Sequence, residues 1–339
     1  MKTKLIELII ILNVIISIVI INCAYADPPL FEHYFQTTDN LRGVAVGQGD
    51  SFGTDIYVVN DTDGTVIRIN TYGEASIFAT GLASGNWSRL KFDSNGTFNN
   101  DLYVSNLANR GGTDRIYRIS DDGTTSIIYE SSSNYNYLSS GIDFGKGGGF
   151  GNDLYIPDTV HDCLLRLNSS GETSIIGSGV TAYTVDEDLE ITNDSILGNY
   201  AYFTDQDLNR ILRLSPSGIT QGYISGYSGN ALALGSGSFG QYLYLGTDSG
   251  QIFRFDEFRN TRLYISGLGG SINDIAFGLN SMWVVVEGQG LYKIQPIYIL
   301  NSNVVNDGGS ITPSYGEYAE GTVVNLIATP DEGYRVKYW

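Results

Sequence analysis

Few residues in this chain have the chemistry of a catalytic or binding site, and most of those offer oxygen atoms. The 339 residues include only two His and two Cys but 37 Asp or Glu. Glu187, Asn230 and Asn273 stand out because each lies two residues before the first strongly apolar residue of a short β-like segment. Carboxylate and amide oxygens suit Ca²⁺ or Mg²⁺ rather than zinc. These three residues therefore form a candidate metal site.

Nitrogen and sulfur ligands are scarce. Cys163 is the only Cys beyond the first 26 residues, so no disulfide is expected within the remaining chain. Its neighbour His161 suggests a nucleophile and base, but adjacent residues seldom form a catalytic dyad, and we interpret Cys163 as a structural thiol. His161 has no evident base or metal companion in the sequence, which favours a surface His over a general base.

A repeat places these residues. Its unit is a strand centred on an aromatic residue, a turn, and a strand with a basic residue before an aliphatic one. Six copies are present, and their marker aromatics are separated by 46, 52, 47, 42 and 39 residues. This spacing is typical of the four-stranded blade of a β-propeller. The six marker aromatics are Tyr57, Tyr103, Tyr155, Tyr202, Tyr244 and Trp283.

The strands around each marker predict an all-β, six-bladed propeller. Every copy has an inner strand before the marker, but the sixth copy has no outer strand after Ile294. Residues 31–38 directly precede the first inner strand, so they fit the missing position and would close the ring without a free edge. The Gly-rich stretches 145–151 and 235–240 lie between inner and second strands, and no helix follows them. We interpret both as hairpin connectors rather than phosphate-binding loops.

In a propeller, the loops between outer and inner strands share one face with the loops between second and third strands. We expect a ligand to bind on this face, over the channel. Six aligned positions begin the inner strands: Arg42, Ser88, Ser140, Glu187, Asn230 and Asn273. The alternative for the two Asn residues is that they cap turns. The candidates for contact with a ligand on this face are Arg42, Trp87, Tyr135, His161 and Asp188.

The second-to-third-strand loops repeat an Asn or Asp three residues after the marker, at Asn60, Asn106, Asp158 and Asp205. Repetition in register favours a structural role in which the side chain closes its own turn. The least repetitive surface combines Trp87 with residues 107–113 and 135–137, and we predict that it contacts a glycan or a protein.

The motifs LYVxD, RI and Asn-Asp-Ile-Ala-Phe (273–277) resemble NHL-repeat propellers and the six-bladed gluconolactonase-like family. The resemblance implies one divalent cation in the channel that polarises a lactone carbonyl, with Glu187, Asn230 and Asn273 at the matching positions. Secreted propeller lyases that open cyclic peptides rely on a channel His, which here would be His33 or His161. The Glu-Gly-Pro-x-Trp motif of the gluconolactonase-like family is missing, and Arg42 faces the site.

The ends of the chain differ from the repeat. Residues 1–26 carry Lys2 and Lys4, a long apolar run and Ala24-Tyr25-Ala26, which predicts a cleaved signal peptide, with an uncleaved membrane anchor as the alternative. The propeller is expected over 27–296 and a linker over 297–302. Residues 303–339 resemble a bacterial surface repeat of the internalin B-repeat type, which looks truncated at Trp339.

Composition limits the functions. The chain carries 19 Lys or Arg against its 37 acidic residues, a net charge of -18, and has no basic run, which argues against nucleic acid as a partner. We predict a bacterial protein that is secreted, displayed on the cell surface or periplasmic, monomeric, and without a membrane span after signal cleavage. The first hypothesis is a non-enzymatic module that binds protein or glycan. The alternative is a lactonase or esterase that uses Ca²⁺ or Mg²⁺ in the channel.

Overall fold

The computed structural model describes residues 31–49, 51–85, 87–107, 113–131, 138–158, 161–178, 188–304, 308–319 and 322–336. Residues 31–294 form one compact unit, and the chain from 295 onward belongs to a second. The signal peptide predicted for residues 1–26 lies outside the described part of the chain. Among the described residues, no helix has the length and apolar character needed to cross a membrane.

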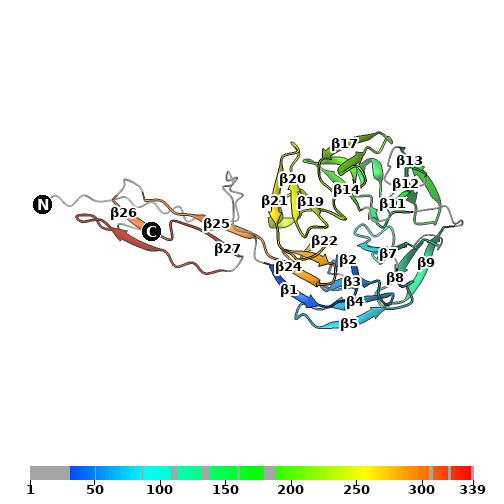
Figure 1. The fold of residues 1–339 in the computed structure, drawn as a ribbon, viewed down its shortest axis with the longest axis horizontal. Helices are drawn as coiled ribbons and strands as arrows, with labels where there is room; N and C mark the ends of the chain where they lie inside the picture. The colour runs from blue at the N-terminus through cyan, green and yellow to red at the C-terminus, as the bar shows by residue number, and fades with distance from the viewer. Residues whose placement is uncertain are drawn as a thin grey trace. The chain divides into compact units, whose positions relative to one another are not determined.

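The first unit is an all-β propeller of six four-stranded sheets arranged around a common centre (Figure 1). Blades are numbered along the chain, and in blades 1 to 5 the sheet order follows the sequence from the inner strand outward. Blade 1 contains β2 (Leu41–Val46), β3 (Ile56–Asn60), β4 (Thr65–Ile69) and β5 (Ala75–Ala79). Blade 2 contains β6 (Trp87–Phe92), β7 (Leu102–Leu107), β8 (Arg115–Ile119) and β9 (Thr125–Glu130). Blade 3 contains β10 (Asp143–Phe144), β11 (Leu154–Asp158), β12 (Cys163–Leu167) and β13 (Thr173–Ile176).

The remaining blades follow the same plan. Blade 4 contains β14 (Leu189–Asp194), β15 (Gly198–Asp205), β16 (Arg210–Leu214) and β17 (Thr220–Ser225). Blade 5 contains β18 (Ala231–Leu234), β19 (Leu243–Gly246), β20 (Ile252–Phe255) and β21 (Thr261–Ile265). Blade 6 contains β22 (Ile272–Gly278), β23 (Ser281–Val286) and β24 (Gly290–Ile294).

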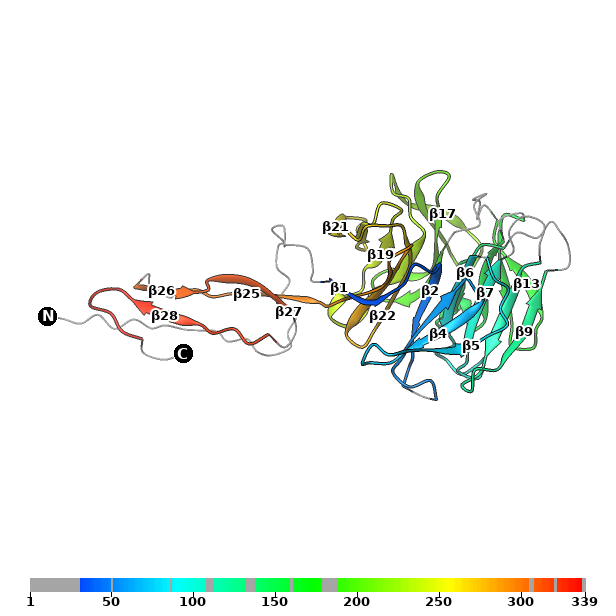
Figure 2. The same cartoon turned by 60° about the horizontal axis from the view of Figure 1, so that its bottom comes forward.

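The ring is closed by the N-terminal strand, as predicted. Strand β1 (Phe31–Gln36) pairs antiparallel with β24, with Phe31 opposite Ile294 and Gln36 opposite Gly290. Blade 6 therefore takes three strands from the C-terminal end of the propeller and its outer strand from the N-terminal end (Figure 2). Without β1, blade 6 would have only three strands, so the N-terminal strand completes this blade.

The hydrophobic core is divided among the blade interfaces. The described residues form six clusters of buried side chains, and each cluster draws its members from two neighbouring blades. The inner and second strands are buried almost throughout, because they are covered by the next blade on both faces. This explains why their sequences read as nearly continuous apolar runs.

The marker aromatics have a common role. Each lies on the second strand of its blade, and its side chain donates a hydrogen bond to the backbone carbonyl five residues earlier. In blade 1 the Tyr57 hydroxyl donates to the Phe52 carbonyl at 2.8 Å, and burial raises the pKa of Tyr57 to about 12. The marker therefore fixes the loop between inner and second strands while its ring fills the core.

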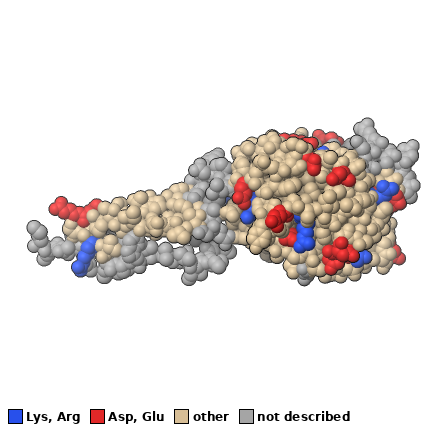
Figure 3. Space-filling view, turned by 90° about the horizontal axis from the view of Figure 1, so that it is seen from below, with Lys and Arg blue, Asp and Glu red and all other residues tan. Residues whose placement is uncertain are grey.

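The basic residue of the third strand is also explained by the register. In blades 1 to 3 it forms an ion pair with the Asp two residues before the marker, as in Arg118 with Asp101. In blades 4 and 5 the corresponding arginines, Arg213 and Arg254, lie over tyrosine rings instead. Acidic side chains are scattered over the side of the propeller shown in Figure 3, with fewer Lys or Arg among them.

The turn prediction is confirmed where the structure describes the loops. The carboxylate or amide oxygen of Asn60, Asp158 and Asp205 accepts a backbone N–H two or three residues later. The Gly-rich stretches are hairpin connectors, and each contains only a single 3₁₀ turn, η1 (Gly148–Phe150) or η2 (Gly237–Phe239), before a strand. No phosphate-binding loop is formed there.

The second unit consists of two strand pairs. Strand β25 (Ile297–Asn301) pairs with β27 (Tyr315–Ala319), and β26 (Gly309–Thr312) pairs with β28 (Ile327–Pro330). Residues 297–301, which we expected to be linker, are therefore strand. The sequence Ile-Tyr-Ile-Leu has the β-branched and aromatic residues that favour pairing, and Tyr315 to Ala319 supply the partner.

Candidate functional site

The starts of the inner strands meet at one end of the channel, which we call the mouth. Five of the six aligned positions are buried there: Arg42, Ser88, Ser140, Asn230 and Asn273. Ser88 Oγ donates to Asp61 at 2.7 Å, and Asn106 Nδ2 donates to Ser88 Oγ at 3.0 Å. The predicted alignment therefore brings residues from different blades into one polar ring.

Arg42 links three blades at the mouth. Its Nη1 donates to Asn273 Oδ1 at 3.2 Å, its guanidinium carbon lies 3.9 Å from the centroid of the Trp87 ring, and its Nη2 is 3.7 Å from a Glu287 carboxylate oxygen. The side chain is only 8% exposed, whereas that of Glu287 is 52% exposed. Burial against an aromatic ring strengthens such a cation–π contact. Arg42 is therefore a fixed part of the wall.

A second cluster surrounds Asn230. Its Oδ1 accepts a hydrogen bond from Gln206, and its Nδ2 donates to Asp248 Oδ1 at 2.6 Å and to Ser271 Oγ at 3.0 Å. Ser271 Oγ also donates to Asp248 Oδ1 at 2.9 Å. Asp248 is exposed, while Gln206 and Ser271 are partly buried. The four residues, which we call the Asn230 cluster, present amide, hydroxyl and carboxylate groups to solvent at the mouth.

The two asparagines do not fit a divalent cation. The Asn273 oxygen accepts from the Arg42 guanidinium, and the Asn230 oxygen accepts from Gln206. A guanidinium on a ligand oxygen would also repel a metal ion. Glu187 lies outside the described residues, and no group of three or more His, Cys, Asp or Glu side chains in the described part of the chain is arranged to hold a metal. The Ca²⁺ or Mg²⁺ site stays a prediction, and no step below uses it.

Beneath the mouth, Arg89 crosses the channel. Its Nη1 donates to the carbonyls of Arg42 and Ser88, and its Nη2 donates to the Asn230 carbonyl at 3.0 Å. Blades 2 and 5 are opposite each other in a six-bladed ring, so this side chain reaches from one wall to the other. Arg89 is 1% exposed. The guanidinium therefore closes the channel just below the mouth.

A group of ion pairs fills the channel beyond Arg89. Lys91 Nζ lies 3.1 Å from Glu190, and Lys146 Nζ contacts Glu190 and lies 3.2 Å from Asp143. Burial raises the pKa of Glu190, but Lys146 and Lys91 lower it further, so the net pKa is below its usual value. Removing one partner of such a buried pair leaves an uncompensated charge, which is costly. The channel is thus filled by side chains from blades 2, 3 and 4.

Three aspartates join neighbouring blades through the backbone. Asp143 accepts the N–H of Ile191, Asp188 that of Leu232, and Asp274 that of Val44, all at 2.7 or 2.8 Å. Each donor belongs to the inner strand of the next blade. Burial and the nearby Asp274 raise the pKa of Asp188 to about 7. Asp188, which we expected on the ligand face, is instead fully buried, because it bonds the next inner strand rather than solvent.

His161 has a companion that the sequence did not reveal. Its Nδ1 lies 2.8 Å from Asp158 Oδ2, and its side chain is 53% exposed. Our expectation of no base nearby was therefore wrong, because the tight turn folds the ring back onto the residue three positions earlier. His33 lies on the outer strand β1, against Tyr292, and is far from channel chemistry. Burial raises the pKa of Cys163 to about 12, so it is a structural thiol.

The other candidates divide between the mouth and the undescribed loops. Trp87 is partly buried and packs against the core between blades 2 and 3 as well as against Arg42. Tyr135, Glu187 and most of the predicted contact surface at 107–113 and 135–137 lie outside the described residues. Gln206, Ser271 and the charged side chains of the channel were not predicted from the sequence. The sequence signal for the charged channel was a pair of charged residues two positions apart on an inner strand, as in Arg89 and Lys91.

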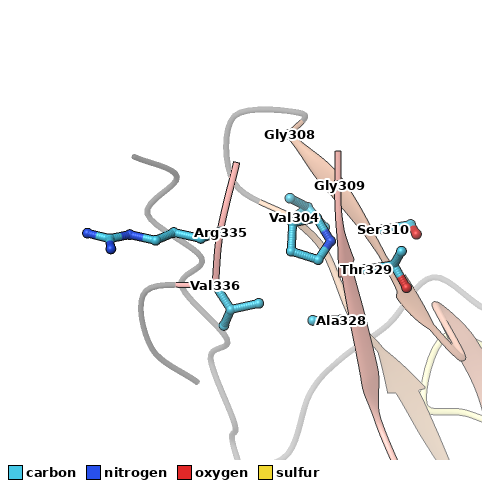
Figure 4. Close-up of a pocket in the computed structure, with 9 residues that line it drawn as sticks. Val304, Gly308, Gly309, Ser310, Ala328, Thr329, Arg335 and Val336 are labelled. Carbon is cyan, nitrogen blue, oxygen red and sulfur yellow. The ribbon is translucent and has the colours of Figure 1, made fainter. Parts of the chain in front are cut away.

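The described part of the second unit contains a minor pocket. It lies between β26 and β28, with Val304 and Val336 nearby, and encloses about 10 Å³ (Figure 4). That is space for one water molecule at most. The pocket has no polar cluster comparable to the mouth of the propeller.

Residues 301–339 match the family model of the divergent InlB B-repeat domain. The predicted internalin-type repeat is thereby confirmed. No curated protein matches this chain by sequence. The family match covers only the C-terminal unit, so the propeller has to be compared through its structure.

Solved structures resemble the propeller. A virginiamycin B lyase from Staphylococcus aureus is 16% identical, with a TM-score of 0.53, over 76% of this chain and 96% of the lyase. A gluconolactonase from Xanthomonas campestris is 12% identical, with a TM-score of 0.55, over 80% and 95%. An auxiliary nutrient binding protein from Bacteroides thetaiotaomicron is 11% identical, with a TM-score of 0.57, over 76% and 69%. At identities this low, the structural likeness establishes the fold alone. This fold serves enzymes and a binding protein alike.

Proposed function

We propose that this protein is a binding module that recognises a glycan at the mouth of the propeller. The main support is that Arg89 and the ion pairs beneath it close the channel. A ligand therefore meets surface groups rather than an internal cavity. The Asn230 cluster offers amide, hydroxyl and carboxylate groups, which pair well with sugar hydroxyls because hydroxyls both donate and accept. Trp87 supplies an aromatic edge at the same mouth.

A glycan suits this mouth better than a protein partner does. The centre of a protein interface is usually apolar and depleted of charge. At this mouth, the aligned positions are polar, and Glu287 and Asp248 add exposed carboxylates. A protein partner is therefore kept as an outcome of the test below rather than as the proposal.

The lactonase alternative rests on likeness of fold. It requires a cation to polarise the substrate carbonyl, and the oxygens of Asn230 and Asn273 already accept hydrogen bonds from Gln206 and Arg42. The neighbouring folds include a lyase and gluconolactonases, but their low identity to this chain supports no transfer of activity.

We also propose that the protein is located outside the bacterial cell, and the C-terminal repeat supports this location. Repeats of this type resemble surface modules, and a glycan-binding propeller on such a repeat would meet its ligand at a cell surface. Secretion through the signal peptide at residues 1–26 belongs to the same proposal.

The test is binding of the full-length protein to a glycan array, followed by calorimetry on the best ligand. Gln206→Ala and Asp248→Asn each remove one polar group from the mouth, and we expect each to weaken binding about tenfold. Asp256→Asn is the matched control, because its carboxylate closes an exposed turn between β20 and β21 at the other end of blade 5.

Two results would overturn the proposal. One is the absence of any glycan ligand together with bound metal and turnover of a lactone or ester panel. The other is equal loss of binding in Asp256→Asn and Asp248→Asn. Capture of a protein that competes with no glycan would replace the glycan by a protein partner.

A further inference from the structure

A second cavity lies at the opposite end of the propeller from the mouth. Loops of antiparallel strands alternate between the two ends of a blade, so the loops joining inner to second strands are at the far end from the mouth. Two of these loops, in blades 1 and 2, enclose a cavity of about 220 Å³. One water needs roughly 10–15 Å³ of such space. The cavity therefore has room for a small organic molecule.

The cavity arises where blade 2 departs from the repeat. The loops 47–55, 93–101 and 145–153 have equal length and begin with Gly47, Asp93 and Gly145, respectively. A Cβ at Gly47 or Gly145 would lie 2.4 Å from a carbonyl oxygen across its own loop, so only glycine fits that tight form. Blade 2 has Asp93 at this position, and Asp93 lines the cavity. The departure from glycine therefore lies in the cavity wall.

The carboxylate of Asp93 organises this loop. It is 1% exposed and accepts backbone N–H groups from Asn95 at 3.1 Å, Phe98 at 2.7 Å and Asn100 at 3.1 Å. Asn100 has a φ of 57°, in the left-handed region that asparagine tolerates better than most residues. A buried carboxylate with three such partners needs no metal ion, and it holds the Asn100 side chain at the cavity wall.

Three uncommitted polar side chains line the cavity. Gln48, Ser94 and Asn100 are exposed, and their side chains form no hydrogen bond within the part of the chain that the structure describes. Phe52 and Phe92 complete the wall, with ring centroids 4.9 Å apart. Two amides, a hydroxyl and aromatic edges thus converge on one space.

We propose that this cavity binds a neutral polyhydroxylated molecule of about monosaccharide size. Amides and hydroxyls match hydroxyl groups, which also donate and accept. None of the described residues that line the cavity is Lys or Arg, which an anion would need, and the carboxylate of Asp93 is already paired with backbone donors. The site is separate from the mouth, so this inference does not depend on glycan binding there.

The experiment is saturation-transfer NMR and calorimetry on the full-length protein with a panel of monosaccharides and polyols, with CaCl₂ and inorganic phosphate as the charged comparisons. Asn100→Gly removes the amide while keeping a backbone conformation that glycine adopts readily. Gln48→Ala removes a second amide. We expect each to weaken binding of the preferred sugar about tenfold.

Asn99→Gly is the matched control, because Asn99 is also left-handed, with a φ of 66°, but does not line the cavity. We expect it to bind the sugar as the unmodified protein does. The Asp248→Asn variant, altered at the mouth, should also bind normally. The proposal fails if no neutral sugar or polyol binds at ~50 mM, a weak limit by the usual affinity scale. It also fails if only Ca²⁺ or phosphate binds, or if Asn99→Gly and Asn100→Gly lose binding equally.

Discussion

Replacing Asp188 with Asn should change how the stability of the propeller depends on pH. Asp188 is fully buried, accepts the N–H groups of Leu189 and Leu232, and is repelled electrostatically by the carboxylate of Asp274. Burial and then Asp274 raise its pKa from 3.8 to about 7, against the opposing effect of Arg89 and Lys91. The folded protein therefore binds a proton at this site more tightly than the unfolded chain does.

The size of the effect follows from linkage. Each pKa unit is worth about 1.4 kcal/mol, so the raised pKa contributes about 4 kcal/mol of stability below pH 3.8. This contribution is lost as the pH rises through 7. Between pH 5 and pH 8 the loss is about 2.5 kcal/mol. In a unit of this size, that corresponds to a melting temperature about 5 °C higher at pH 5 than at pH 8.

The assay is urea unfolding of the unmodified protein and Asp188→Asn at pH 5, 6, 7 and 8. We expect the difference between their free energies of unfolding to move by about 2.5 kcal/mol in favour of the unmodified protein as the pH falls. Asn cannot titrate, so the variant lacks this contribution. Parallel curves for the two proteins over this range would refute the reasoning.

Glu190→Gln is the control. The pKa of Glu190 is lowered below 4.5, so its contribution to stability is complete above that value and is lost only in more acidic solution. From pH 5 to pH 8 it is constant. The variant should be less stable by about 3 kcal/mol, because Lys91 and Lys146 lose their partner, but its curve should run parallel to that of the unmodified protein.

Three further predictions concern stability and reactivity. Tyr103→Phe removes a buried hydroxyl that donates to a backbone carbonyl at 2.9 Å, and urea unfolding should show a loss of about 1 kcal/mol, whereas Tyr72→Phe, at an 89% exposed ring, should change nothing measurable. Gly141→Ala would place a methyl group 2.6 Å from a backbone nitrogen of the next blade and should cost about 1–3 kcal/mol, while Gly222→Ala, with nothing within 4 Å, should be tolerated. Cys163 should resist a thiol reagent at pH 8 until the protein unfolds, and rapid labelling of the native thiol, mapped by peptide mass, would contradict its raised pKa.

The propeller was predictable because its determinants are local and repeated. Each marker aromatic donates to a carbonyl only five residues away, and the turns at Asn60, Asp158 and Asp205 are closed by their own side chains. The closing strand could be assigned by elimination, since the sixth copy lacked an outer strand and residues 31–38 had no other place. Strands that alternate within a blade leave few arrangements to choose from.

The candidate site was predicted less well, because its chemistry depends on residues far apart in the sequence. The alignment correctly placed Arg42, Asn230 and Asn273 at the mouth. It did not show that the Arg42 guanidinium donates a hydrogen bond to the side-chain oxygen of Asn273, 231 residues away. Asp188 was assigned to the ligand face from its position alone, although one further residue along a strand reverses the direction of the side chain.

The amino-acid sequence by itself determined the all-β class, the six blades, the closing strand and the C-terminal repeat, because period, turn residues and marker spacing act over short distances. Only the tertiary structure decided which charges meet. Arg89 and Asn230 are 141 residues apart, and Lys91 and Glu190 are 99 apart, yet each pair bridges the channel. Such contacts exist only once the ring has closed, and the closed ring turns a set of acidic and basic inner-strand residues into a filled channel.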